Sequence, residues 1–127
     1  MIKVLKASAG SGKTWNLARQ YIRLLLEKRD EYSYRHILAV TFTNKATDEM
    51  KDRILKELHR LSNDPCSSGY YRDFVPSLFP DAQALSEAAG TILCNILHDY
   101  SAFAVSTIDR FFQQTLKSFA REIGQFS

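Results

Sequence analysis

The segment A-S-A-G-S-G-K-T at residues 7–14 constrains the fold of this chain more than any other segment does. It matches the phosphate-binding loop G-x-x-x-x-G-K-[ST] except at the first position, where Ala7 replaces glycine. A short apolar run at 2–5 precedes it, and a helical pattern of apolar residues begins at Lys13. Because such a loop lies between a strand and a helix, the segment predicts an α/β fold with a parallel sheet and a phosphate-binding site.

The residue types of this loop explain how it would hold a nucleotide. Gly10 and Gly12 let the backbone wrap closely around an anion, while successive N–H groups and the positive end of the helix form a cradle. We expect Lys13 to reach the β- and γ-phosphates and the Thr14 hydroxyl to bind Mg²⁺. Trp15 is expected to pack its helix on the sheet. The predicted nucleotide-binding residues are Ala9, Gly10, Ser11, Gly12, Lys13 and Thr14.

Alternating strand and helix patterns continue along the chain. Near-continuous apolar runs predict two further buried strands, at 36–43 and 103–106. Spacings of three and four between apolar residues predict helices at 13–28, 44–61, 81–100 and 107–123. This order predicts a parallel sheet flanked by helices, with right-handed crossovers. In the last helix, the residues predicted to face the core are Phe111, Phe112, Leu116, Phe119 and Ala120.

Residues 63–80 interrupt this order. They hold all three prolines, a Ser-Ser-Gly run and several aromatic residues, which predicts an irregular segment. With the helix that follows, it makes a predicted insertion at 63–100 within a single domain that covers 1–127. We expect its aromatic residues to form a small core of their own or to contact another domain; they are Tyr70, Tyr71 and Phe74.

The charge of the chain is divided unevenly. The net charge is +3, yet the segment from Asp64 to Tyr100 holds five acidic residues and a single basic one, Arg72. The positive field therefore lies outside the insertion, where it suits a polyanion, although solubility alone also explains it. We expect the insertion to be separable, so that replacing residues 65–80 by a short Gly/Ser linker leaves nucleotide binding intact.

A second signal follows the middle strand. The run V-T-F-T-N-K-A at 40–46 places hydroxyls, a phenylalanine and an asparagine where a strand of a parallel sheet ends, and open α/β folds bind ligands at that edge. The next helix, with Thr43 or Asn44 as its N-cap, can hold a phosphate there, Lys45 adds charge and Phe42 can stack on a base. The residues alone also allow the alternative that Phe42 is buried and that the N-cap of this helix is an ordinary one.

Three segments resemble the motifs of a known family. ASAGSGKT at 7–14 and VTFTNKATDEMKDRI at 40–54 resemble motifs I and Ia of the UvrD/Rep-type superfamily 1 DNA helicases, and STIDRFF at 106–112 resembles motif Ib. The closer likeness is to the RecB/AddA branch, the helicase–nuclease subunits of double-strand-break repair complexes such as exodeoxyribonuclease V. Its members begin almost at the phosphate loop, often with A-S-A-G in place of the first glycine. Only six residues precede Ala7, which leaves no room for the adenine-contacting glutamine motif of UvrD itself.

This resemblance implies a RecA-like motor domain. Lys13 and Thr14 would hold MgATP and serve its hydrolysis, with ATP and Mg²⁺ as cofactors. The residues implied to face single-stranded DNA are Thr41, Phe42, Thr43, Asn44 and Thr107. Hydrolysis would drive stepping along DNA during repair or recombination, in a complex with other subunits of a helicase–nuclease.

Asp109 departs from the family's pattern. Motif Ib usually reads T-x-H-x-F, and Asp109 takes the place of the histidine. Because a carboxylate repels a phosphate backbone, we expect Asp109 to cap its helix or to hold Arg110.

Two other function classes remain open. The run F-A-V-S-T-I-D at 103–109 can be taken as the acidic strand of a small P-loop kinase or GTPase, although Ser106 and Thr107 interrupt it and no second acid follows Asp109. The third class is a non-catalytic module that binds only a nucleotide or a partner. After the segment at 106–112 the chain holds no D-E-x-x pair for Mg²⁺ and the attacking water, and it holds no later arginine finger, second motor domain or nuclease motif. We therefore expect the first part of a motor, which does not unwind DNA by itself.

Composition argues against membrane and secreted classes. Hydrophobic residues make up 45% and charged residues 24% of the chain, as in soluble proteins that form a core. No apolar stretch approaches the ~18 residues of a membrane span, and the N-terminus lacks the pattern of a signal peptide. We therefore expect a cytoplasmic protein without a membrane partner.

Overall fold

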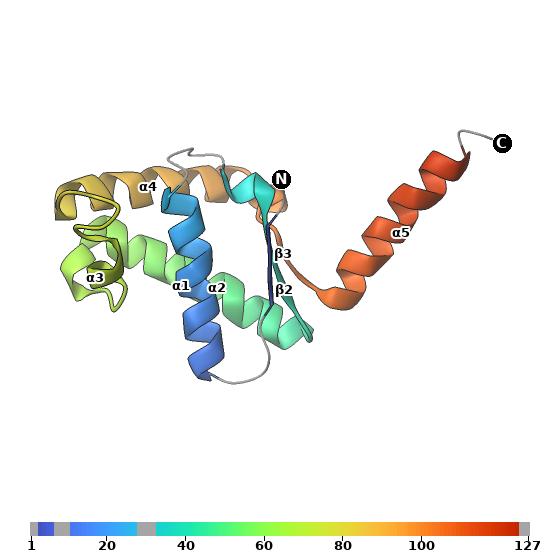
Figure 1. The fold of residues 1–127 in the computed structure, drawn as a ribbon, viewed down its shortest axis with the longest axis horizontal. Coiled ribbons are helices and arrows are strands. Elements are labelled where there is room, and N and C mark those ends of the chain that lie inside the picture. The colour runs from blue at the N-terminus through green and yellow to red at the C-terminus, as the bar shows by residue number, and fades with distance from the viewer. Residues whose placement is uncertain (1–2, 7–10, 28–32, 125–127) are drawn as a thin grey trace.

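The computed structural model describes residues 3–6, 11–27 and 33–124. Within them the chain is mostly helical, with a small parallel sheet, and is compatible with the predicted α/β class (Figure 1). No helix in these ranges is long and apolar enough to cross a membrane. In chain order the elements are β1 (Lys3–Lys6), α1 (Ser11–Glu27), η1 (Ser33–His36), β2 (Ile37–Thr41), α2 (Asn44–Asn63), η2 (Pro65–Ser67), α3 (Tyr71–Phe74), α4 (Ala82–His98), η3 (Tyr100–Ala102), β3 (Val105–Thr107) and α5 (Ile108–Gly124).

The sheet has three parallel strands in the order β1-β2-β3. In the middle strand, Ala39 is paired with Leu5 on one side and with Val105 on the other. All five residues of β2 are buried, which explains its continuous apolar run. Because the strands run in the same direction, the helices that follow them begin at one edge of the sheet. Figure 1 shows the starts of α1, α2 and α5 near the lower end of the strands.

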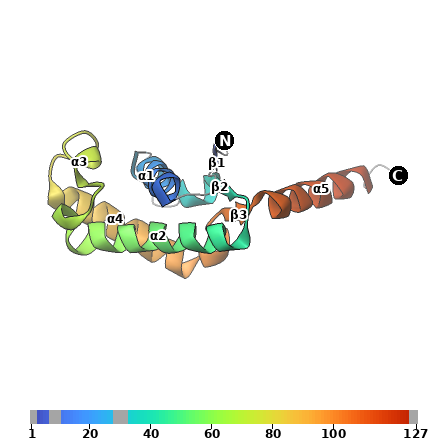
Figure 2. The ribbon, with the colours of Figure 1, turned by 90° about the horizontal axis from the view of Figure 1, so that it is seen from below.

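The core lies between the sheet and the helices α1, α2 and α4, which gather on one side of it (Figures 1 and 2). Each helix buries residues at the predicted spacing of three and four, because this spacing returns a side chain to the same face. Among the buried residues are Leu17, Tyr21 and Leu25 of α1, Met50, Ile54, Leu58 and Leu61 of α2, and Leu85, Ala89, Ile92 and Ile96 of α4.

The Tyr21 side chain in α1 is fully buried and contacts Phe103, with 5.8 Å between the ring centroids. Its hydroxyl has no hydrogen-bond partner among the described residues, and burial raises the pKa of this hydroxyl. Since an unpaired buried hydroxyl is unfavourable, we expect Tyr21→Phe to leave the free energy of unfolding unchanged or to raise it by about 1 kcal/mol. Urea denaturation measures this, and a clear loss of stability would contradict it.

The insertion packs on α1, the helix that follows the predicted phosphate loop. The ring centroids of Trp15 and Tyr70 are 4.6 Å apart, and the Tyr70 hydroxyl donates a hydrogen bond of 2.7 Å to the Trp15 carbonyl oxygen. Gly69 permits this approach, because a Cβ atom there would lie 3.2 Å from the Trp15 ring. Trp15 therefore packs α1 on the insertion, whereas the sequence led us to expect that it packs α1 on the sheet.

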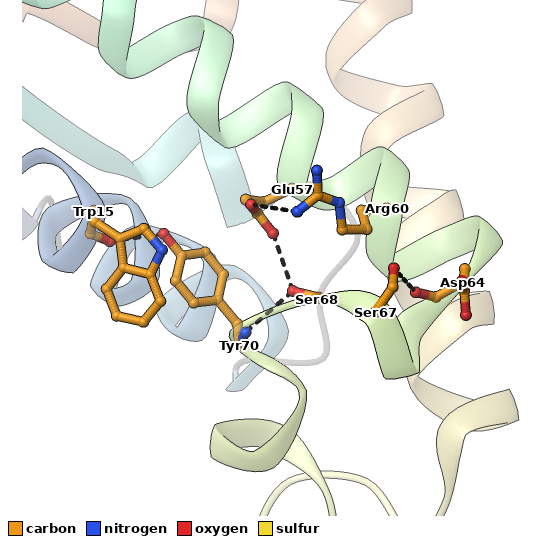
Figure 3. A network of polar contacts seen from close by, with 7 residues as sticks. All are labelled: Trp15, Glu57, Arg60, Asp64, Ser67, Ser68 and Tyr70. Carbon is orange, nitrogen blue, oxygen red and sulfur yellow. Dashed lines mark hydrogen bonds and ion pairs between the residues drawn. The ribbon is translucent and has the colours of Figure 1, made fainter. Parts of the chain in front are cut away.

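A buried carboxylate fastens the insertion to α2 as well (Figure 3). Glu57 is buried, and its Oε2 accepts a 3.0 Å hydrogen bond from the Ser68 hydroxyl. The Ser68 Oγ in turn accepts the N–H of Tyr70 at 3.1 Å, and Arg60 lies 3.5 Å from Glu57 Oε1. This chain of contacts sets the backbone of the insertion at the point where Tyr70 turns toward α1.

The aromatic residues of the insertion belong to the main core. Tyr70 and Phe74 are fully buried in the same cluster as the apolar faces of α1, α2 and α4, and Tyr71 packs against this cluster. They do not form a core of their own, and the expectation that the insertion is separable loses its structural basis. The pattern of prolines and aromatics located the segment but not the surface that it covers.

The last helix differs from its prediction. α5 extends away from the sheet on the side opposite to α1 and α2 (Figures 1 and 2), and none of its residues is buried. The prediction that Phe111, Phe112, Leu116, Phe119 and Ala120 face the core was therefore wrong for the described residues. The helix has the apolar face that its spacing indicates, but the described chain places no surface against that face.

Candidate nucleotide and nucleic-acid site

The predicted phosphate loop at residues 7–14 follows β1 and runs into the first turn of α1 in the sequence. The backbone of residues 11–14 forms the first turn of α1, directly after the loop that leaves β1 at Lys6. A strand, a loop and a helix thus follow one another as the sequence motif requires. The predicted nucleotide-binding residues Ala9 and Gly10 lie outside the described residues, as do the side chains of Ser11, Lys13 and Thr14.

A set of threonines shapes the turn between β2 and α2. Thr41 ends β2 with 1% of its surface exposed, and its hydroxyl shares a hydrogen bond with the Thr47 hydroxyl. Thr43 is the N-cap of α2, because its Oγ1 accepts the N–H of Ala46 at 3.0 Å. The Thr43 carbonyl oxygen also accepts the N–H and the hydroxyl of Thr47. Thr41 is thus a support of this turn, and its burial leaves it unavailable to a ligand on the surface.

Phe42 lies just beyond the end of β2 and is 63% exposed. The hydrogen bonds of Thr41 and Thr43 on either side hold the backbone of this turn, so the Phe42 ring projects into solvent from a fixed position. Asn44 begins α2 and is also exposed. The alternative of a buried Phe42 is therefore excluded, while the cap by Thr43 is present beside the exposed ring.

Thr107 holds the corresponding position at the end of β3. It is paired with Thr41 in the sheet, and its Oγ1 accepts the N–H of Arg110 at 3.2 Å, as an N-cap of α5 does. Asp109 is exposed in the first turn of α5. Thr107, and not Asp109, thus makes the capping contact that the sequence led us to expect of Asp109.

A groove connects the ends of β2 and β3. It measures about 440 Å³, and we call it the edge groove. The positive ends of α2 and α5 meet at it, because both helices begin next to the paired strand ends. Backbone N–H groups, the guanidinium of Arg110 and the ring of Phe42 can serve a ligand that carries both phosphates and bases, whereas Asp109 adds one negative charge. The lining residues are Phe42, Thr43, Asn44, Thr107, Asp109, Arg110 and Gln113.

The edge groove contains both residues that the sequence predicted and residues that it missed. Four predicted residues line it together: Phe42, Thr43, Asn44 and Thr107. Arg110 and Gln113 were missed as candidates for ligand contact. Their spacing of three and six residues from Thr107 was the available signal, since it places all three along one side of the first turns of a helix.

The kinase or GTPase alternative loses its main support. It requires Asp109 to end a strand, but β3 ends at Thr107 and Asp109 lies in α5. Among the residues that the structure describes, no group of histidine, cysteine or acidic side chains is arranged to hold a metal ion.

Comparisons with known proteins find relatives that cover most of the chain. The chain matches the family described as "UvrD/REP helicase N-terminal domain" over residues 2–127. It is 32% identical to the RecBCD enzyme subunit RecB of Escherichia coli (strain K12), an alignment that covers 96% of this chain and 11% of that protein. It is also 32% identical to RecB of Buchnera aphidicola from Acyrthosiphon pisum, with 91% of this chain and 10% of that protein covered.

A relative from a second named group matches a shorter stretch. It is an ATP-dependent helicase/nuclease subunit from Natranaerobius thermophilus, 44% identical over 63 residues, which are 49% of this chain and 5% of that protein. The chain thus spans about a tenth of the length of its RecB relatives. No solved structure matches the chain.

Proposed function

The chain belongs to the UvrD/REP helicase N-terminal domain family, and on this basis we propose that it forms the ATP-binding part of the first motor domain of a RecB/AddA-type DNA helicase. The observation that carries the proposal is the meeting of three strand-to-helix junctions at one edge of a parallel sheet. The first junction holds the phosphate loop, and the other two form the edge groove.

The first junction supports binding of MgATP. The start of α1 supplies N–H groups and the positive end of the helix, and Gly12 among them leaves room for close approach of phosphates. In the proposed site, Lys13 holds the β- and γ-phosphates, and Thr14 holds Mg²⁺ together with the nucleotide. Mg²⁺ supplies charge stabilisation of the phosphates. The chain's own contribution is to orient the phosphates on a rigid helix start.

The second and third junctions support contact with single-stranded DNA. The exposed ring of Phe42 can stack on a base, and such stacking tolerates any sequence because every base has a flat aromatic face. Thr43, Asn44 and Thr107 are proposed to contact the sugar–phosphate backbone at the two helix starts. Thr41 is left out of this contact surface because it is buried, and we assign it the support of the turn.

The full-length protein is proposed to act in the cytoplasm in DNA repair or recombination, in complex with other helicase–nuclease subunits. The names of its relatives, which are subunits of RecBCD and of a helicase/nuclease, support this assignment. The proposed nucleotide site follows strand β1, and Phe42 follows strand β2. Because these two strands are paired directly, a structural change at the bound phosphates has a short route to Phe42. Unwinding is proposed for the full-length protein and not for these 127 residues alone.

Phe42→Ala tests the DNA side of the proposal. In the full-length protein we expect this change to weaken binding of single-stranded DNA by ~1–3 kcal/mol, because one stacking platform is lost. The thermal unfolding temperature should change little, since the ring is exposed and fills no space in the core. Fluorescence anisotropy with an oligodeoxythymidine measures the affinity.

Leu97→Ala is the matched control, because Leu97 is a large apolar residue of α4 with 57% exposure and lies outside the edge groove. It should leave DNA affinity unchanged. Equal affinities for the Phe42→Ala variant and the unchanged protein would contradict the proposed DNA edge, and so would a severe loss of stability with intact affinity.

A further inference from the structure

The helix α5 carries two opposed faces. Its apolar residues recur every three or four positions along one side, and the cationic residues Arg110, Lys117 and Arg121, which are seven and four positions apart, lie along the other. We call these three the basic stripe. Both acidic residues of the helix, Asp109 and Glu122, lie off it. The apolar side consists of Ile108, Phe112, Leu116, Phe119 and Ile123.

The charges of the basic stripe are not neutralised within the described chain. All three residues are exposed, and none of them takes part in an ion pair with another described residue. Other cations of the chain do have acidic partners, as in the pairs Arg35–Asp99 and Lys56–Asp52. Arg110 and Arg121 are eleven positions apart, so the stripe extends for about 16 Å along the helix axis.

The basic stripe begins where the edge groove ends. Arg110 lines the edge groove, and it also lines a second hollow beside β3, of about 320 Å³. Gln114, one turn after Arg110, lines this hollow too, together with Lys51 and Tyr100. The Lys51 ammonium lies 5.4 Å from the centre of the Tyr100 ring, and that ring is 45% exposed. A further cation and an exposed aromatic ring thus adjoin the start of the stripe.

We propose that the basic stripe of α5 and the hollow of Lys51 and Tyr100 extend the single-stranded DNA path beyond the edge groove. This inference rests on the proposed function. A flexible polyanion is the ligand that matches a line of unpaired cations, and the ring of Tyr100 adds a surface for a base. The apolar face lies opposite, so the stripe stays accessible when that face is covered.

Continuity favours DNA over an acidic protein segment. The stripe shares Arg110 with a groove whose two helix starts and exposed phenylalanine suit phosphates and bases. The part of the insertion from η2 to the start of α4, which holds Asp73 and Asp81, lies at the other end of the molecule from α5 (Figures 1 and 2), and Asp99 near the end of the insertion is paired with Arg35.

The test is the salt dependence of DNA affinity in the full-length protein. The double variant Lys117→Gln/Arg121→Gln removes two charges of the stripe outside the edge groove, and Lys56→Gln/Arg72→Gln removes two exposed charges elsewhere. Affinity for an oligodeoxythymidine is measured between about 50 and 200 mM salt. Loss of two phosphate contacts should make the slope of log K against log[salt] shallower by about 1.4 in the stripe variant only. The charge-preserving variant Lys117→Arg/Arg121→Lys should keep the original slope.

The outcomes separate this inference from the proposed function. An unchanged slope in the stripe variant, with DNA affinity still dependent on Phe42, overturns the stripe and leaves the proposed function standing. Equal changes of the salt slope in the two glutamine variants indicate a general electrostatic field of the protein and not a DNA path along the stripe. This result also overturns the inference. Loss of binding to another protein of the complex without a change in the salt slope assigns the stripe to a protein partner. Absence of any single-stranded DNA binding in the unchanged protein overturns both proposals.

Discussion

Lys13→Ala is expected to lower the affinity for ATP by about 10- to 100-fold, because a charged hydrogen-bond donor to the phosphates is worth ~1.5–3 kcal/mol. The backbone donors of the first turn of α1 remain, so some binding should persist. Hydrolysis should fall further than binding, by roughly 100-fold or more, because the lost charge also stabilises the transition state. Calorimetry with ATP and a phosphate-release assay on the full-length protein measure the two effects.

The matched control is Lys45→Ala. Lys45 is an exposed lysine in the first turn of α2, so it resembles Lys13 in residue type, local structure and position at the sheet edge. We expect the Lys45 variant to keep its ATP affinity and the Lys13 variant to lose it. Equal ATP affinities in the Lys13 variant and the unchanged protein would contradict the assignment of residues 7–14 to the nucleotide phosphates.

The elements that the sequence predicted best are those with local causes. The amphipathic spacing from Asn44 onward predicted α2. Of the two residues that the sequence offered as its N-cap, Thr43 and Asn44, the structure shows Thr43, whose Oγ1 accepts the N–H of Ala46. Both depend on residues within one or two turns of each other. The burial of Thr41 was also predictable, because Thr41 alternates with Ile37 and Ala39 on the core face of β2.

Two features depended on contacts that no local pattern contains. The periodicity of α5 shows that one face is apolar, but it does not show what covers that face, and the described chain leaves it exposed. The bond from Tyr70 to Trp15 joins residues 55 positions apart, so proline and glycine signals near Tyr70 could not reveal it. The edge groove was predictable only in part, because Arg110 enters it through the pairing of β2 with β3.

Phe74→Ala tests whether the insertion is a part of the core. The Phe74 side chain is fully buried, and its ring contacts that of Tyr70 with 6.4 Å between the centroids. Removing it leaves a cavity between the insertion and the helices, so the free energy of unfolding should fall by ~3–5 kcal/mol. Phe112→Ala is the matched control, because Phe112 is 56% exposed in α5 and its removal should cost less than about 1 kcal/mol. Urea denaturation of this chain measures both values.

Replacing residues 65–80 by a Gly/Ser linker should have a still larger effect, and it should also weaken nucleotide binding. The deletion removes the Tyr70 ring and hydroxyl that contact Trp15, and it removes the Ser68 partner of the buried carboxylate of Glu57. A buried carboxylate that loses a hydrogen-bond donor is destabilising even with Arg60 still 3.5 Å away, and α1 loses its support one residue after Thr14. Tyr70→Phe separates the two causes, because it keeps the ring in the core but removes the bond to α1. If the linker variant keeps both its stability and its ATP affinity, the insertion is an accessory after all, and the packing of Tyr70 on Trp15 has no bearing on the phosphate loop.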